Sequence, residues 1–229
     1  ELPQYHIPSP KTVLMHVWER VWSFLKKAGT ILFVCCMVMW ILATLGFENG
    51  AFGLVEQTEN SFMAMLGGIL APIFAPLGFG SWQAVASSIS GFVAKEGIVS
   101  TMGVLAGLAD AGETDVALWE YVMNDFFMGN AIAAFSFLAF NLLDSPCLAA
   151  ISTAAKEFGD KKWTAFAIVF QNVFAYCVCL IIYQLGSFIM GGGFGVGTAA
   201  AIIVLAVGLY LLFRPAPKAE KGRAAAARA

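Results

Sequence analysis

The sequence predicts an all-α protein, a polytopic bundle of about six apolar transmembrane segments, one or two of them broken or re-entrant. Of its 229 residues, 59% are hydrophobic and 12% are charged, and the mean hydropathy is +0.78. Every Lys and Arg except Lys95 falls within residues 11–27, 156–162 or 214–228. A soluble domain scatters its charges over its whole surface, so this confinement indicates a chain shaped by the lipid bilayer.

Residues 1–27 are predicted to form a cytoplasmic leader. Within it, Val13, Val17 and Val21 recur at helical spacing among basic residues, which favours an amphipathic helix at the cytoplasmic interface. A cytosolic extension of the first membrane helix explains the same pattern equally well. Because Glu1 is not a methionine and no signal peptide follows it, the chain is expected to begin inside a longer polypeptide.

Residues 28–213 form the predicted membrane domain. Its apolar segments are 28–45, 62–77, 84–108, 126–151, 164–188 and 198–213. Residues 214–229 are rich in Ala, Pro, Lys and Arg, and this composition favours a basic, disordered cytoplasmic tail.

The loops between these segments differ in charge. Residues 46–60 and 110–125 contain acidic residues and no cation, whereas the basic residues lie at 11–27, 156–162 and 214–228. If both termini are cytoplasmic, six crossings place every basic flank inside and every acidic loop outside. This arrangement satisfies the positive-inside rule.

The segment 62–77 allows two interpretations. Pro72, Pro76 and Gly78 break a helix readily, and broken backbone persists at membrane depth only where protein or a water-filled cavity receives it. The segment is therefore either a full short crossing or one arm of a re-entrant hairpin that enters from outside. Loop charge does not distinguish the two, because the hairpin leaves every loop on the same side.

Lys95 and Glu96 lie side by side within an apolar segment, and ionisable residues at membrane depth are functional-site candidates by default. Adjacent residues on a helix point about 100° apart, so each needs a partner on another segment, or the helix must be unwound locally. The pair either fixes the fold or lies along a substrate path or gate. Ser90, one of several small polar residues nearby, either lines that path or packs at a helix contact.

A second polar cluster contains Asn141, Asp144, Ser145, Pro146 and Cys147. Proline removes a backbone hydrogen bond and frees carbonyl oxygens in the preceding turn. A carboxylate, a thiol and free carbonyls at one depth suit a transient site for a borderline divalent cation such as Fe²⁺. The alternative is a proline kink with a packing cysteine.

Three further amides, Asn130, Gln171 and Asn172, stand in apolar surroundings, where interhelical hydrogen bonds are their expected role. The sequence has no P-loop, no H-E-x-x-H motif and no nucleophile elbow. It also has no basic face with interleaved aromatic residues outside the membrane flanks. Neither an enzyme nor a nucleic-acid-binding protein is therefore expected.

Two runs resemble the ferrous iron transporter family FeoB closely. They are residues 69–83, I-L-A-P-I-F-A-P-L-G-F-G-S-W-Q, and residues 91–105, G-F-V-A-K-E-G-I-V-S-T-M-G-V-L. Residues 18–31, 137–147 and 163–184 are similar to the same family. The resemblance spans about residues 1–213 and corresponds to the C-terminal part of the FeoB membrane region, with the second of two Gate segments.

This resemblance implies a multi-pass permease that carries Fe²⁺ across the inner membrane of a prokaryotic cell. It also implies an upstream G domain that binds GTP and Mg²⁺, and a first Gate, neither of which is present in this sequence. The lipid bilayer, Fe²⁺ and these upstream domains are the expected partners, and no cofactor is expected to stay bound to the chain itself. A small cytosolic accessory protein and further copies of the chain are additional expected partners.

The family's Pro-Cys motif falls on Pro146 and Cys147, and its Ala-Lys-Glu motif falls on residues 94–96. The resemblance makes Cys147 the candidate soft ligand of Fe²⁺, with Asp144 and Glu96 as hard ones. The residues expected along the path or gate are Lys95, Pro146, Asn141 and Ser90. Asp144 stands where an apolar, aromatic or Cys residue is expected in many relatives, which leaves its ligand role open.

Gate segments also resemble parts of nucleoside-transporter-like proteins. A carrier for a nucleoside or another small organic solute is therefore the alternative function, and a structural scaffold for other subunits is a third. The acidic outer loops favour the metal, because they attract divalent cations and repel anions. A negative interior potential draws Fe²⁺ inward by about 4.6 kcal/mol per 100 mV for its two charges.

Overall fold

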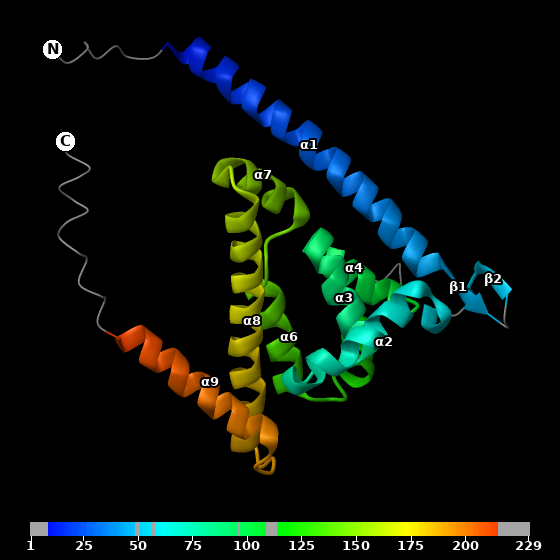
Figure 1. The fold of residues 1–229 in the computed structure, drawn as a ribbon. Coiled ribbons are helices and arrows are strands. Elements are labelled where there is room, and N and C mark those ends of the chain that lie inside the picture. Colours follow the sequence, from blue (N-terminus) through cyan, green and yellow to red (C-terminus); the bar gives the residue numbers. More distant parts are fainter. Residues whose placement is uncertain (1–8, 49–50, 56–57, 96, 109–113, 215–229) are drawn as a thin grey trace.

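The computed structural model describes residues 9–48, 51–55, 58–95, 97–108 and 114–214, which are mostly helical (Figure 1). The helices are α1 (Pro10–Thr44), α2 (Phe62–Phe74), α3 (Trp82–Val93), α4 (Gly97–Leu105), α5 (Val116–Tyr121), α6 (Ala131–Leu143), α7 (Leu148–Phe158), α8 (Lys161–Ile189) and α9 (Val196–Phe213). The shorter elements are the helical turns η1 (Thr58–Asn60), η2 (Ala75–Leu77) and η3 (Val122–Phe126), and the strands β1 (Leu45–Glu48) and β2 (Ala51–Leu54). The predicted all-α class is confirmed. The first residues of the leader, most of the predicted tail (215–229) and Glu96 lie outside the described residues.

Helix α1 is continuous over 35 residues and runs obliquely past the rest of the bundle (Figure 1). The Ser9 side chain caps its start by accepting a hydrogen bond from the Thr12 N–H at 3.3 Å. Pro10 suits the first helical position, where its missing N–H is not needed. The helix passes residue 27 without a break, so residues 10–44 form one helix. The location of residues 10–27 at the membrane interface stays a prediction.

A small antiparallel hairpin, β1 with β2, follows α1 and was not expected from the sequence. The rings of Phe47, Phe52 and Phe62 pack together beside it, with centroids 5.6 to 6.0 Å apart. The dipeptide Asn49-Gly50 separates the two strands in the sequence, and Asn-Gly is the strongest short-range hairpin signal.

The core lies where α6 and α8 pack side by side, with α3 and η2 against them (Figure 1). Phe79, Phe126 and Phe137 are fully buried there, and Phe79 meets Phe137 edge to face at 5.4 Å. The Ser136 hydroxyl donates to the carbonyl of Cys179 at 3.3 Å, which ties α6 to α8.

The chain bends by 98° between residues 62–77 and α3. Gly78 sits at this bend with φ of +93°, and a Cβ there would lie 2.3 Å from the Tyr183 ring, so only glycine fits. The Gln184 amide donates to the Pro76 carbonyl at 2.7 Å and satisfies one backbone group at the break. The predicted break in this part of the chain is confirmed.

Helices α3 and α4 pack as the two arms of a hairpin. The Thr101 hydroxyl lies 2.8 Å from the Ser90 hydroxyl, and the end of α4 lines the same cavity as Trp82 and Gln83 at the start of α3. The turn lies at Ala94–Lys95, where Ala94 has extended backbone with φ of −152° and ψ of 111°. The apolar segment expected over 84–108 therefore folds back on itself as two helices. Both helices are apolar, so by composition alone they resemble a single membrane span.

Three helical stretches are long and apolar enough to cross a membrane among the residues described: Ala131–Phe158, Lys161–Ile189 and Val196–Phe213. The bent pair Phe62–Leu77 and Trp82–Val93 is either a fourth span that is broken or a re-entrant element. The chain is a multi-pass membrane protein, but six crossings are not confirmed.

Candidate functional site

Two interrupted helices meet at the candidate site. The first interruption lies between α3 and α4, and the second lies between Leu143 at the end of α6 and Leu148 at the start of α7. Asp144 opens the second interruption with extended backbone, φ of −62° and ψ of 174°. Pro146 lies within it and has no N–H to continue the helix.

Lys95 connects the two interruptions. Its ammonium group donates to the Asp144 carboxylate at 2.5 Å, to the Asn141 carbonyl at 2.7 Å and to the Asp144 carbonyl at 3.3 Å. These three bonds use all three donors of the ammonium group. The sequence predicted that Lys95 either has a partner on another segment or lies where its helix is unwound, and the structure shows both. Lys95 compensates the Asp144 charge and also satisfies carbonyls at the end of α6.

The site lies well inside the bundle. The Ser145 hydroxyl donates to the Ile168 carbonyl at 3.3 Å, and the Asn172 amide donates to the Ser145 hydroxyl at 2.5 Å. Ile168 is about 10 Å along α8 from Lys161, and the whole 29-residue helix is about 43 Å long. The tip of the α3–α4 hairpin therefore lies within the length of α8 and not at its end.

Asn141 lies beneath the Lys95–Asp144 pair and is 7% exposed. Its amide donates to the Phe137 carbonyl at 2.8 Å and to the Ser88 hydroxyl at 3.3 Å. Its side-chain oxygen is buried and accepts no hydrogen bond from the part of the chain that the structure describes. Gly91 on α3 faces this oxygen, since a Cβ there would lie 3.4 Å from it and 2.6 Å from the Ile98 side chain. Gly91 therefore allows α3, α4 and α6 to approach closely.

Ser90 is buried inside the α3–α4 hairpin. Its hydroxyl donates to the Ser87 carbonyl at 2.8 Å and accepts from the Thr101 hydroxyl at 2.8 Å. This is the geometry expected of a helix contact. The Ser87 hydroxyl is buried beside it without a hydrogen-bond partner among the described residues.

Cys147 is half-buried and occupies the N-cap position of α7. In the described part of the chain, no group of three or more His, Cys, Asp and Glu side chains is placed to hold a metal ion. Glu96 lies outside that part, so the combination of Cys147, Asp144 and Glu96 stays a prediction. In this conformation the Asp144 carboxylate is bound to Lys95.

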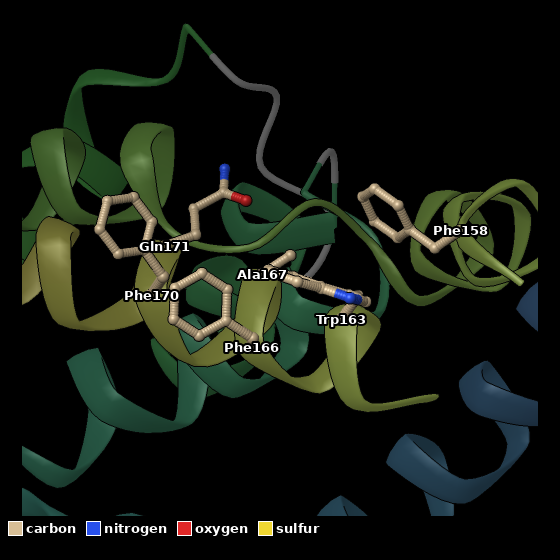
Figure 2. Close-up of a pocket in the computed structure, with 6 residues that line it drawn as sticks. All are labelled: Phe158, Trp163, Phe166, Ala167, Phe170 and Gln171. Carbon is tan, nitrogen blue, oxygen red and sulfur yellow. The ribbon is translucent and has the colours of Figure 1, made fainter. Parts of the chain in front are cut away.

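The three predicted interhelical amides have different roles. The prediction for Asn172 is confirmed, because its amide bonds to Ser145 and ties the second interruption to α8. The prediction for Asn130 is wrong, since its side chain caps α6 by accepting from the Ile132 N–H at 2.9 Å. Gln171 lines an open apolar pocket between α7 and α8 together with aromatic rings (Figure 2). That pocket has no ionisable side chain and is separate from the candidate site.

A polar cavity of about 430 Å³ lies at the open end of the α3–α4 hairpin. Thr58, Glu59, Gln83 and Tyr121 are among its lining residues. Burial raises the pKa of the Tyr121 phenol above its ordinary value of 10.0, and the carboxylates of Asp125 and Glu59 raise it further. Groups from the two acidic loops therefore converge on one polar surface.

The fold and this site define a multi-pass helical membrane protein in which two interrupted helices share a buried polar centre. The Gate family model, described as nucleoside recognition, matches residues 25–161. The chain belongs to this Gate family and, by the similarities that follow, to the C-terminal membrane part of the FeoB family.

Several relatives of this chain are named Fe(2+) transporter FeoB. The protein from Staphylococcus aureus strain MSSA476 is 38% identical over 186 residues, covering 81% of this chain and 26% of the relative. The protein from Methanocaldococcus jannaschii is 34% identical over 191 residues, covering 82% of this chain and 27% of the relative. A Porphyromonas gingivalis relative, named a Fe(2+) transport protein A/Fe(2+) transporter FeoB fusion protein, is 29% identical over 224 residues, covering 81% of this chain and 26% of the relative. The chain thus spans about a quarter of the length of these relatives, and no solved structure matches it.

Proposed function

We propose that this chain is the membrane permease portion of a transporter that moves Fe²⁺ into the cytoplasm, controlled by a GTP-binding domain that the chain lacks. The observation that carries the proposal is the meeting of two interrupted helices inside the bundle, with Asp144 and Cys147 in one interruption. Irregular backbone at membrane depth is typical of ion and substrate pathways. The names of the FeoB relatives supply the identity of the ion.

Within this proposal, Cys147 is the soft ligand that distinguishes Fe²⁺ from Mg²⁺ and Ca²⁺, and Asp144 is a hard ligand. Glu96 is the second candidate carboxylate. Lys95 and Asn141 lie at the gate, because they occupy the contact between the two interruptions. Pro146 keeps the second interruption open, and Ser90 holds the arms of the re-entrant hairpin together.

The proposed topology has both termini in the cytoplasm of a prokaryotic cell and the acidic loops outside. Ser61 at the start of α2 pairs with Gly46 next to the end of α1, and Pro76 beyond α2 contacts Gln184 near the end of α8. Helix α2 therefore connects two ends that the charge pattern places outside. Four crossings by α1, α6 with α7, α8 and α9 then satisfy the positive-inside rule, with the α3–α4 hairpin entering from outside.

The proposed partners lie outside this chain. They are an upstream G domain with its GTP and Mg²⁺, a first Gate, the lipid bilayer and other copies of the chain. A small cytosolic accessory protein is supported by the Porphyromonas gingivalis relative, whose name joins a Fe(2+) transport protein A to FeoB.

The test is uptake of radioactive ⁵⁵Fe²⁺ by the intact transporter, meaning this chain together with its proposed G domain and first Gate. Cys147→Ser is expected to reduce uptake by about tenfold, the loss typical when a group that tunes a metal site is removed. Cys177→Ser is the matched control, because Cys177 is a half-buried thiol in the apolar groove between α8 and α9. Equal uptake by the two variants would remove Cys147 from the mechanism.

The second candidate function is transport of a nucleoside, favoured by the description of the Gate family model. It predicts uptake of labelled uridine or adenosine by the intact transporter, with no uptake of Fe²⁺. Fe²⁺ uptake without nucleoside uptake would eliminate it.

A further inference from the structure

The Lys95 ammonium group occupies a position that suits a free cation. Three oxygens surround it within 3.3 Å: the Asp144 carboxylate, the Asp144 carbonyl and the Asn141 carbonyl. Carboxylate and carbonyl oxygens are the ligands that hard and borderline divalent cations take in proteins. Two of the three belong to the main chain at the C-terminal end of α6, where the helix dipole also favours positive charge.

The same place holds a further oxygen that lacks a partner. The Asn141 side-chain oxygen is buried, and no described residue donates a hydrogen bond to it. Leaving such a group unsatisfied destabilises the fold, so a buried acceptor without a donor indicates a role that the resting contacts do not use. Asn141 thus supplies one oxygen to Lys95 and keeps a second one free.

We propose that these oxygens form a cation site that Lys95 fills in the resting conformation, and that a divalent cation takes its place. The proposal rests on the Fe²⁺ permease function and adds how the site is kept closed between ions. Asp144 is 2% exposed, so its charge must be compensated at every step. Exchange of Lys95 for a divalent cation keeps the Asp144 charge compensated, whereas departure of Lys95 without an incoming cation does not.

Charge and mobility both favour this exchange. A divalent cation interacts with the Asp144 carboxylate through two charges where the ammonium group has one. The Lys95 side chain is 32% exposed and stands at the tip of a hairpin, so it has a way out that Asp144 lacks. The Ser90–Thr101 hydrogen bond joins the two arms of the α3–α4 hairpin. When Lys95 leaves Asp144, the two arms therefore move together. Ion binding would in this way open the contact between the two interruptions.

The first test measures the exposure of Lys95 in the wild-type intact transporter. The protein in detergent is acetylated with acetic anhydride, with and without Mn²⁺ as an air-stable divalent probe, and each lysine is quantified by mass spectrometry. Acetylation of Lys95 is expected to rise about tenfold with Mn²⁺, within the range typical of coupled binding events. Lys156, an exposed lysine on α7, is the internal control and should not change. Unchanged Lys95 acetylation at saturating Mn²⁺ would overturn the exchange.

The second test measures Mn²⁺ affinity. Lys95→Met is expected to bind Mn²⁺ about tenfold more tightly than wild type, because the tethered competitor is gone. The double variant Lys95→Met with Asp144→Asn should lose that gain. Retention of the gain in the double variant would contradict the proposed ligand. The wild-type acetylation result decides the matter if Lys95→Met does not fold.

Uptake of ⁵⁵Fe²⁺ by the same preparation separates this inference from the proposed function. Uptake with constant Lys95 acetylation would overturn the exchange and leave the permease standing. Increased Lys95 acetylation without Fe²⁺ uptake would support the cation site and overturn iron transport.

Discussion

The interrupted helices of this protein hold a buried ion pair, whereas the continuous helices α8 and α9 are apolar over most of their length. Helices α8 and α9 run unbroken over 29 and 18 residues, and residues 163–213 contain no Lys, Arg, Asp or Glu. The α3–α4 hairpin and the α6–α7 interruption hold Lys95 and Asp144. An interruption exposes carbonyl oxygens that lipid cannot satisfy, so a cation that bonds to them can be accommodated at the same place. Among the described residues of these helices, the buried Lys95–Asp144 pair lies where the backbone is also broken.

The largest expected effect on stability breaks that partnership. Lys95→Ala leaves the Asp144 carboxylate buried and uncompensated, and removal of one partner from a buried ion pair costs about 3–5 kcal/mol. The free energy of unfolding, measured by SDS titration in mixed micelles, should fall by that amount. Lys156→Ala on the exposed face of α7 should change it by less than about 0.5 kcal/mol. Equal, small losses in both variants would show that the interrupted region does not depend on the ion pair.

A smaller effect is expected from a methyl group added to each region. Gly91→Ala places a Cβ 2.6 Å from the Ile98 side chain and 3.4 Å from the Asn141 oxygen, and such overpacking costs about 1–3 kcal/mol. Gly208→Ala in α9 has no atom within 4 Å of the new Cβ and should stabilise its helix by about 0.5–1 kcal/mol. The same SDS titration measures both. A stabilising Gly91→Ala would mean that α3 and α6 do not approach as described.

The smallest effect concerns the bond between the two regions. Asn172→Ala on α8 removes the hydrogen bond to Ser145, and such bonds within membranes contribute about 0.6 kcal/mol on average. Gln171→Ala, the neighbouring change in the open apolar pocket, is the control and should have no measurable effect on the free energy of unfolding. Equal free energies of unfolding for the two variants would show that the Asn172–Ser145 bond does not tie the second interruption to α8.

The sequence predicted the class of the protein and its polar residues better than their pairing. Confinement of cations to three flanks indicated a membrane chain, and the isolated position of Lys95 identified it as a candidate. Its partner Asp144 lies 49 residues away, and only the tertiary fold brings the two together. The sequence did not predict the turn at Ala94, because both arms of the hairpin are apolar and a single membrane span has the same composition.

Two local features of the fold have signals in the neighbouring sequence. Gly129-Asn130 before an apolar run is a typical helix start, and Asn130 caps α6 instead of bonding to another helix. Asn49-Gly50 marked the β1–β2 hairpin. These signals depend on neighbouring residues alone, whereas the contact between the two interruptions does not.

Uptake of ⁵⁵Fe²⁺ by the intact transporter carrying Asp144→Asn tests most directly whether the meeting of the two interruptions is the ion path. Asp160→Asn is the matched control, because Asp160 lies exposed at the N-cap of α8 and asparagine caps a helix equally well. Asp144→Asn is expected to reduce uptake by at least about tenfold, while Asp160→Asn should leave it at the wild-type rate. Wild-type uptake by a folded Asp144→Asn variant would mean that the ion does not pass the meeting of the two interruptions.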